Sequence, residues 1–242
     1  MKRGPKVYSA ISGLLVVDKP LYWSSMDVVR HVRRAAGGAK TGHAGTLDPL
    51  ASGVVICCLG KATRCVSQVM AMTKIYHAVI DLSSFTSTDD REGQRSPVEV
   101  AITPTKQAVQ AALGTFVGHI SQVPPTYSAV HVKGQRAYKM ARRGESVLLL
   151  PRTVRVDAIE MLNYDWPMLS VRITCGRGTY IRSIARDLGG KHCTGGHLAV
   201  LCRIAVGSYD LSIAVNQQRL DDPITQADLI DPPVAEGLAA DS

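Results

Sequence analysis

The distribution of apolar residues most constrains how this 242-residue chain can fold. The longest apolar run covers residues 54–59, which suits a buried strand and is far below the ~20 residues of a membrane-spanning helix. Strand-like and helix-like patterns follow one another without strict alternation. This order predicts an α+β fold with one mixed or mainly antiparallel central sheet flanked by helices.

The local patterns predict individual elements. Strands are expected over residues 13–17, 54–59, 75–82, 153–162, 168–175 and 197–206. Helices are expected over residues 26–36, 62–70, 106–113, 135–143 and 180–188, with Ser24 or Ser25 capping the first and Thr179 the last. Residues 83–97 read as a polar loop, and the short connection over 163–167 predicts an antiparallel pair.

Basic residues dominate most of the chain. The sequence holds 28 Lys and Arg against 20 Asp and Glu, yet seven of the acidic residues follow Tyr209. The basic part attracts polyanions, although charge alone identifies neither partner nor sequence. We expect a catalytic domain over residues 1–209 and a short acidic tail over 210–242.

The cysteines and histidines do not predict a metal site. None of the six cysteines forms a Cys-x-x-Cys pair, so reduced, mostly buried thiols are expected. His192, Cys193 and His197 cluster in sequence but lack a fourth ligand at motif spacing. With neither a secretory signal nor a membrane helix evident, a cytoplasmic protein is expected.

Residues 40–53 carry the strongest chemical signal. Asp48 is the single carboxylate there, and His43 precedes it by five residues. Gly42, Gly45 and Gly53 permit backbone angles that other residues resist, and Pro49 favours an extended Asp48. The loop therefore predicts a rigidly held nucleophile or base acting on an anionic polymer; the alternative is an ordinary Asp-Pro turn.

Four segments in order extend this signal: residues 13–20, the Asp48 loop, residues 74–76 and residues 176–183. Together they resemble the TruB-type tRNA pseudouridine synthases, and the resemblance covers about residues 13–206. It implies isomerisation of uridine 55 in the T arm of tRNA after base flipping, without a metal or organic cofactor.

The resemblance also implies roles for individual residues. Asp48 matches the essential Asp and nucleophile, and Arg182 matches the active-site Arg, which we expect to pair with Asp48 and keep it ionised. Tyr76 matches a stacking Tyr that assists proton removal. The positions matching residues that contact the uridine or fill its space are His43, Tyr76, Tyr180 and Leu201.

A further segment, residues 123–131 continuing to 143, resembles the insert with which this family grips the T arm; we place the insert at about 123–152. Its basic residues predict a helical stripe that faces phosphates, or else a solvated amphipathic helix. They are Lys133, Arg136, Lys139, Arg142 and Arg143. Lys19 matches a family Lys that binds phosphate or supports the Asp48 loop.

The chain departs from the family pattern in three places. Residues 82–83 and 86–89 differ from the usual loop, and His131 stands where Lys is common. Because about 33 residues follow Tyr209, we expect no C-terminal RNA-binding PUA domain. We expect a monomer without an obligatory protein partner. Two alternatives stay open, a non-catalytic tRNA chaperone and a guide-RNA-dependent synthase subunit.

Overall fold

The computed structural model describes residues 10–128, 130–132, 135–141, 143–145 and 147–233. The chain divides into two compact units, Met1–Met72 with Arg203–Ser242, and Thr73–Cys202. We call these the first and the second unit. None of the described helices combines the length and apolar character of a membrane span.

The first unit is built on antiparallel strands. β1 (Gly13–Lys19) pairs along its whole length with β3 (Ser52–Leu59), and β2 (Thr41–His43) also pairs with β3. α1 (Ser25–Ala35) packs against these strands and buries Val28, Val29 and Val32. Almost every residue of β1 and β3 is buried, so this pair forms the core of the unit.

Shorter elements complete the first unit. They are η1 (Gly60–Cys65), α2 (Val66–Ala71), β13 (Tyr209–Asp210), η2 (Leu211–Ile213), η3 (Gln218–Asp221) and η4 (Gln226–Asp228). The segment that follows β13 returns to β1, because Val215 bridges Val17 and Ile230 bridges Leu14. Apolar contacts of Ile230 and Leu211 with the core hold this segment in place.

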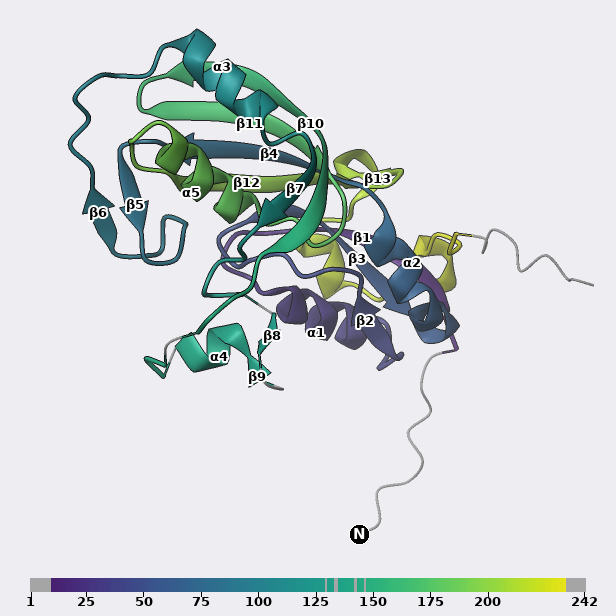
Figure 1. Ribbon diagram of the computed structural model, residues 1–242. Helices are drawn as coiled ribbons and strands as arrows, with labels where there is room; N and C mark the ends of the chain where they lie inside the picture. The colour runs from purple at the N-terminus through teal and green to yellow at the C-terminus, as the bar shows by residue number, and fades with distance from the viewer. Residues whose placement is uncertain (1–9, 129, 133–134, 142, 146, 234–242) are drawn as a thin grey trace, which may run out of the picture. The chain divides into compact units, whose positions relative to one another are not determined.

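The second unit contributes the longer run of strands to the nine-stranded sheet. Its strands follow the order β12 (His197–Val206, which continues into the first unit), β4 (Lys74–Asp81), β11 (Met168–Cys175), β10 (Arg152–Asp165) and β7 (Gly118–Gln122). The pairs β4–β11, β11–β10 and β10–β7 are antiparallel. α3 (Lys106–Gly114) contacts β10, α5 (Ile181–Lys191) contacts β4, and the two helices touch each other (Figure 1).

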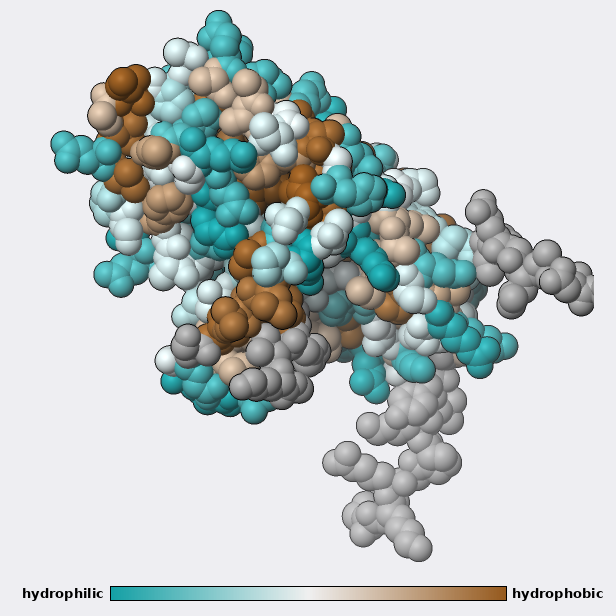
Figure 2. All heavy atoms as spheres, in the orientation of Figure 1, coloured by the Kyte–Doolittle hydropathy of each residue, from teal (hydrophilic) through white to brown (hydrophobic). Residues whose placement is uncertain are grey.

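Two hairpins and a short helix project from the second unit. β5 (Ser84–Thr86) pairs with β6 (Arg95–Pro97), and β8 (His131–Val132) pairs with β9 (Gln135–Arg136), which leads into α4 (Ala137–Ala141). On the face shown in Figure 2, hydrophilic side chains predominate and apolar ones form separate groups. The apolar residues of the strands are instead largely buried.

The α+β class is confirmed, and so are most predicted strands. The first helix is capped as expected: Ser24 and Asp27 form a reciprocal capping box. Thr179 was the wrong cap, because α5 begins after Tyr180 and the Thr179 hydroxyl donates to the carbonyls of Gly176 and Arg155.

Two further predictions need correction. The helix expected over residues 135–143 is shorter, because Gln135–Arg136 pairs as β9 and α4 covers only Ala137–Ala141. The polar loop at 83–97 contains the β5–β6 hairpin, whose short strands lack the alternation that would have identified them. β2 and β7 were not predicted at all.

Candidate active site

The loop around Asp48 has one conformation, set by its glycines and its backbone contacts. Gly45 and Gly53 have φ of +104° and +102°. A Cβ at Gly53 would lie 2.3 Å from the Arg203 carbonyl oxygen, so only glycine fits there. The carbonyl of Pro49 accepts from the Tyr22 backbone N–H at 2.7 Å, and the carbonyl of Asp48 accepts from the Ala51 N–H at 3.1 Å. These contacts fix the backbone that carries the Asp48 side chain.

Lys19 lies beneath this loop and is completely buried. Its Nζ donates to the carbonyl oxygens of Trp23 at 2.7 Å, Pro20 at 2.9 Å and Pro49 at 3.5 Å. Burial lowers the pKa of Lys19 to about 8, while the charge of Asp48 acts in the opposite direction. The geometry favours a support of the Asp48 loop over direct contact with phosphate.

The coupling between these two groups gives a testable titration. Replacing Asp48 with Asn removes a charge that raises the pKa of Lys19, so that pKa should fall below about 8. NMR titration of the Lys19 Nζ in both proteins measures the shift, with the exposed Lys106 as an internal reference. Because the folded pKa lies below the unfolded value of 10.5, the unfolded state binds more protons between about pH 8 and 10.5, and this group makes stability rise with pH there. An unchanged pKa in the Asn variant would contradict the coupling.

Arg203 supports the same loop from β12. It is 1% exposed and donates from Nε to the Val54 carbonyl at 2.7 Å, from Nη2 to Gly45 at 3.2 Å and from Nη1 to Thr46 at 3.4 Å. The sequence pattern did not identify Arg203. The sequence feature that could have identified it is an Arg within an apolar strand, because a buried guanidinium requires hydrogen-bond acceptors.

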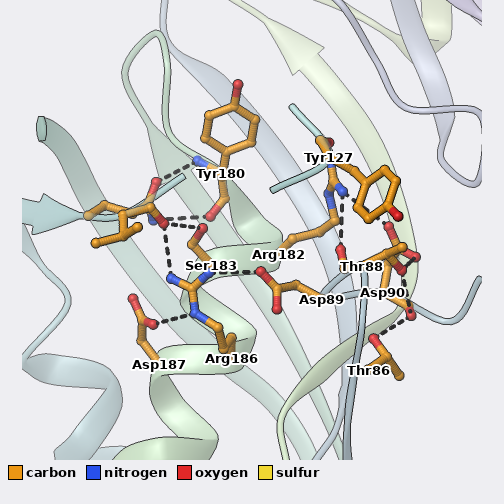
Figure 3. A network of polar contacts seen from close by, with 12 residues as sticks. Thr86, Thr88, Asp89, Asp90, Tyr127, Tyr180, Arg182, Ser183, Arg186 and Asp187 are labelled. Carbon is orange, nitrogen blue, oxygen red and sulfur yellow. Dashed lines mark hydrogen bonds and ion pairs between the residues drawn. The ribbon is translucent and has the colours of Figure 1, made fainter. Parts of the chain in front are cut away.

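In the second unit, Arg182 is held by three groups on two segments, the loop of Thr88 and Asp90 and the segment of Tyr127 (Figure 3). Its Nη1 lies 3.3 Å from Asp90 Oδ2 and donates to the Thr88 carbonyl at 3.2 Å; its Nη2 donates to the Tyr127 carbonyl at 2.9 Å. The side chains of Arg182 and Asp90 are 5% and 4% exposed. A buried guanidinium with this set of partners has a fixed plane and orientation.

Asp90 is itself tightly held. Thr88 Oγ1 and the Glu92 backbone N–H donate to its Oδ1 at 2.5 Å and 3.1 Å, and Thr86 Oγ1 donates to its carbonyl at 2.7 Å. The sequence pattern indicates an unusual loop here and does not identify a role for Asp90. The sequence feature that could have identified Asp90 is the acidic pair Asp89 and Asp90, which lies among threonines.

One turn along α5, Arg186 forms a parallel set of contacts. Its Nη1 lies 2.8 Å from Asp89 Oδ2, and its Nη2 donates to the Val123 carbonyl at 2.9 Å, which also accepts from Ser183 Oγ (Figure 3). Burial raises the pKa of Asp89, and Arg186 opposes that rise. α5 is thereby joined to Val123, at the start of the insert, and to the Asp89–Asp90 loop.

Tyr180, the residue before α5, is fixed at both backbone and ring. The side chain of Gln122, 1% exposed, accepts from the Tyr180 N–H at 2.9 Å and donates to its carbonyl at 3.1 Å. The Arg152 guanidinium lies 4.9 Å from the centre of the Tyr180 ring. Gln122 was not predicted from the sequence.

The remaining predicted site residues fall into the two units. His43 lies in β2 of the first unit with Lys19 and Asp48, whereas Tyr76 lies in β4 and Leu201 in β12 of the second unit. Tyr76 is 9% and Leu201 5% exposed. The predicted pairing of Asp48 with Arg182 would join the two units and stays a prediction.

The structure covers the insert only in part. Lys133 and Arg142 lie outside the described residues, while Arg136 is in β9 and Lys139 in α4. Arg143 is exposed, and its guanidinium donates to Glu145 at 2.6 Å and to Gln135 at 2.7 Å. The helical stripe does not run from Gln135 to Arg143, so the expected phosphate contacts rest on the hairpin and helix together.

Within the described residues, no group of three or more His, Cys, Asp or Glu side chains is arranged to hold a metal ion. The imidazole of His197 is buried; its Nδ1 lies 2.9 Å from the Ser84 carbonyl and its Nε2 lies 3.7 Å from Asp81 Oδ2. The absence of a cofactor stays a prediction.

Comparison with known proteins gives a consistent result. Residues 33–181 match the model of the TruB family pseudouridylate synthase (N terminal domain). The protein named tRNA pseudouridine synthase B of Thermobifida fusca (strain YX) is 44% identical over 236 residues, covering 94% of this chain and 79% of the relative. The protein of the same name from Parabacteroides distasonis is 40% identical, covering 88% and 93%.

Solved structures agree in fold. A chain from the crystal structure of a Cbf5-Nop10-Gar1 complex superposes with a TM-score of 0.68 at 26% identity, over 91% of this chain. This chain spans 56% of the length of that one. A chain from the structure of an H/ACA RNP bound to a substrate RNA containing 2'-deoxyuridine gives a TM-score of 0.64 at 25% identity.

Proposed function

Because this chain belongs to the TruB family of pseudouridylate synthases, we propose that it is a tRNA pseudouridine synthase, an isomerase that converts uridine 55 of the T arm to pseudouridine. The relatives that carry the name tRNA pseudouridine synthase B support the reaction and the substrate class. The single observation that supports the assignment to a site is the Asp48 loop, whose backbone is shaped by glycines and bound at Pro49 by a buried lysine.

The reaction rearranges one nucleotide. The bond between uracil N1 and ribose C1′ breaks, the base turns, and C5 bonds to C1′; C5 then loses its proton and N1 gains one. No electrons are exchanged with a second molecule. We assign Asp48 as the nucleophile, because a held carboxylate can form a covalent intermediate and divide a difficult step in two.

The second unit supplies the other groups. Arg182, whose guanidinium is oriented by Asp90 and by the carbonyls of Thr88 and Tyr127, is assigned to keep Asp48 ionised. Tyr76 is assigned to stack on the extruded base and assist removal of the C5 proton. Tyr180 and Leu201 contact the base, and His43 fills the space that it leaves in the RNA.

Conversion of bare tRNA tests the function. Purified protein incubated with unmodified tRNA should yield pseudouridine at position 55 and nowhere else in the T arm, as mapped by chemical probing. A transcript with cytidine at that position is the matched control. Wild-type protein that leaves uridine 55 unchanged would refute the proposal and favour a chaperone role.

The same assay addresses partners. We propose that the protein acts as a monomer in the cytoplasm, with tRNA as its partner and without a guide RNA or another protein. Activity of the purified chain on bare tRNA, at a mass corresponding to one chain in sedimentation, is the expected result. Activity only after addition of a guide RNA would support the guide-dependent alternative.

The basic insert should dominate the salt-dependent part of tRNA binding. Reversing Arg142 and Arg143 to Glu should weaken binding by about 10-fold or more and flatten the dependence of log Kd on log salt, because fewer counterions are released. The control changes Lys106 and Arg172 to Glu, two exposed cations on α3 and β11 with the same total charge change. Equal effects of both pairs would show that only the net charge matters.

A further inference from the structure

Tyr22 has a backbone conformation that its own packing does not explain. Its φ is +68°, in the left-handed region that a bulky residue rarely adopts. Yet the side chain is 72% exposed, so burial of the ring provides little compensation for the strain. Strained residues that persist in a well-fixed environment cluster at functional sites.

The turn that carries Tyr22 is rigidly attached to the Asp48 loop. The Tyr22 backbone N–H donates at 2.7 Å to the carbonyl of Pro49, the residue after Asp48. The buried ammonium of Lys19 binds the carbonyls of Pro20 and Trp23, on either side of the turn, as well as that of Pro49. The exposed Tyr22 is therefore carried on a backbone that is hydrogen-bonded to the residue after the candidate nucleophile.

Two further large apolar residues close to Tyr22 in the sequence are open to solvent. Leu21 is 41% and Met26 51% exposed, and the Tyr22 backbone binds a loop assigned to a nucleic-acid reaction. A fixed aromatic face binds any nucleobase by stacking, with little dependence on sequence. The net charge of +8 favours an RNA ligand over an apolar protein surface.

We propose that Tyr22 is a stacking platform for an unpaired nucleobase of the tRNA outside the reacting uridine, with Leu21 and Met26 widening the apolar surface. This inference rests on the proposed function. The hydrogen bond from the Tyr22 backbone to Pro49 fixes the turn relative to the Asp48 loop.

Four variants test the platform. Tyr22→Gly removes both ring and strain, Tyr22→Ala removes only the ring, and Tyr22→Phe keeps the aromatic face. Cys193→Gly is the matched control, because Cys193 is an exposed non-glycine residue with φ of +54° and no assigned role. Binding of a fluorescent T-arm RNA, single-turnover kinetics and thermal unfolding are measured for each.

The platform predicts opposite changes in stability and affinity. Tyr22→Gly should raise Tm by about 2 °C, because the left-handed strain is relieved, and weaken RNA binding on the order of tenfold. Tyr22→Ala should lose the same affinity without the gain in Tm, and Tyr22→Phe should bind like wild type. Cys193→Gly should raise Tm alone. In the variants that lose the ring, the weaker RNA binding should raise KM more than it lowers kcat.

The outcomes separate this inference from the proposed function. Unchanged RNA binding in Tyr22→Gly would overturn the platform even if wild type forms pseudouridine. Equal losses in the Phe and Gly variants would replace stacking by a hydroxyl contact, and a fall confined to kcat would make Tyr22 a support of the Asp48 loop. Wild-type protein that binds the RNA but forms no pseudouridine would overturn the function, while the binding data still decide the platform.

Discussion

Asp48→Asn should lower the rate of pseudouridine formation by a factor on the order of 10⁴ or more while leaving tRNA binding nearly unchanged. The amide has the shape of the carboxylate, so the glycine-shaped loop and the contact of Pro49 with Tyr22 are preserved. What is lost is the negative charge and the nucleophilic oxygen. The measurement is single-turnover conversion of unmodified tRNA, with Kd from filter binding.

The control for this variant is Asp18→Asn. Asp18 is an exposed carboxylate at the end of β1 in the same unit, and it carries the same charge. Its replacement should leave the rate within about twofold of wild type, since surface substitutions of this kind have small effects. If Asp48→Asn retained a tenth of the wild-type rate, the assignment of Asp48 as nucleophile would have to be abandoned.

The sequence predicted features that depend on local pattern. Periodicity identified β3, β11 and α1, because each buries one face or a continuous run. The Ser24 cap was predictable because its partner, Asp27, lies within one turn. The positive φ angles in the Asp48 loop were predictable at Gly45 and Gly53, because glycine adopts them without a steric cost, whereas the third glycine of the loop, Gly42, does not have a positive φ.

Contacts between distant segments were not predictable from one sequence. Arg203 reaches carbonyls about 150 residues away in the chain, and Gln122 binds the backbone of Tyr180. The local sequence around Arg203 or Gln122 does not indicate which residue either of them binds. The clearest missed signal is on α5, where Arg182 and Arg186 are spaced four apart and so share one face, opposite the pair Asp89 and Asp90.

The buried pair of Arg182 and Asp90 gives the second large effect. Arg182→Met should destabilise the protein by about 3–5 kcal/mol, because it leaves the Asp90 carboxylate buried without its cation. It should also lower the rate by about 10² to 10³, the usual cost of losing one oriented charged donor at a reacting centre. Urea denaturation and single-turnover kinetics measure the two effects.

The double variant separates stability from chemistry. Adding Asp90→Asn to Arg182→Met removes the uncompensated charge. The double variant should therefore be less destabilised than the sum of the two single destabilisations. The rate should stay low, because the guanidinium is still missing. Asp90→Asn alone keeps Arg182 bound to the carbonyls of Thr88 and Tyr127 and should therefore lose less activity than Arg182→Met. A double variant that regained activity together with stability would mean that Arg182 serves the fold and not the reaction.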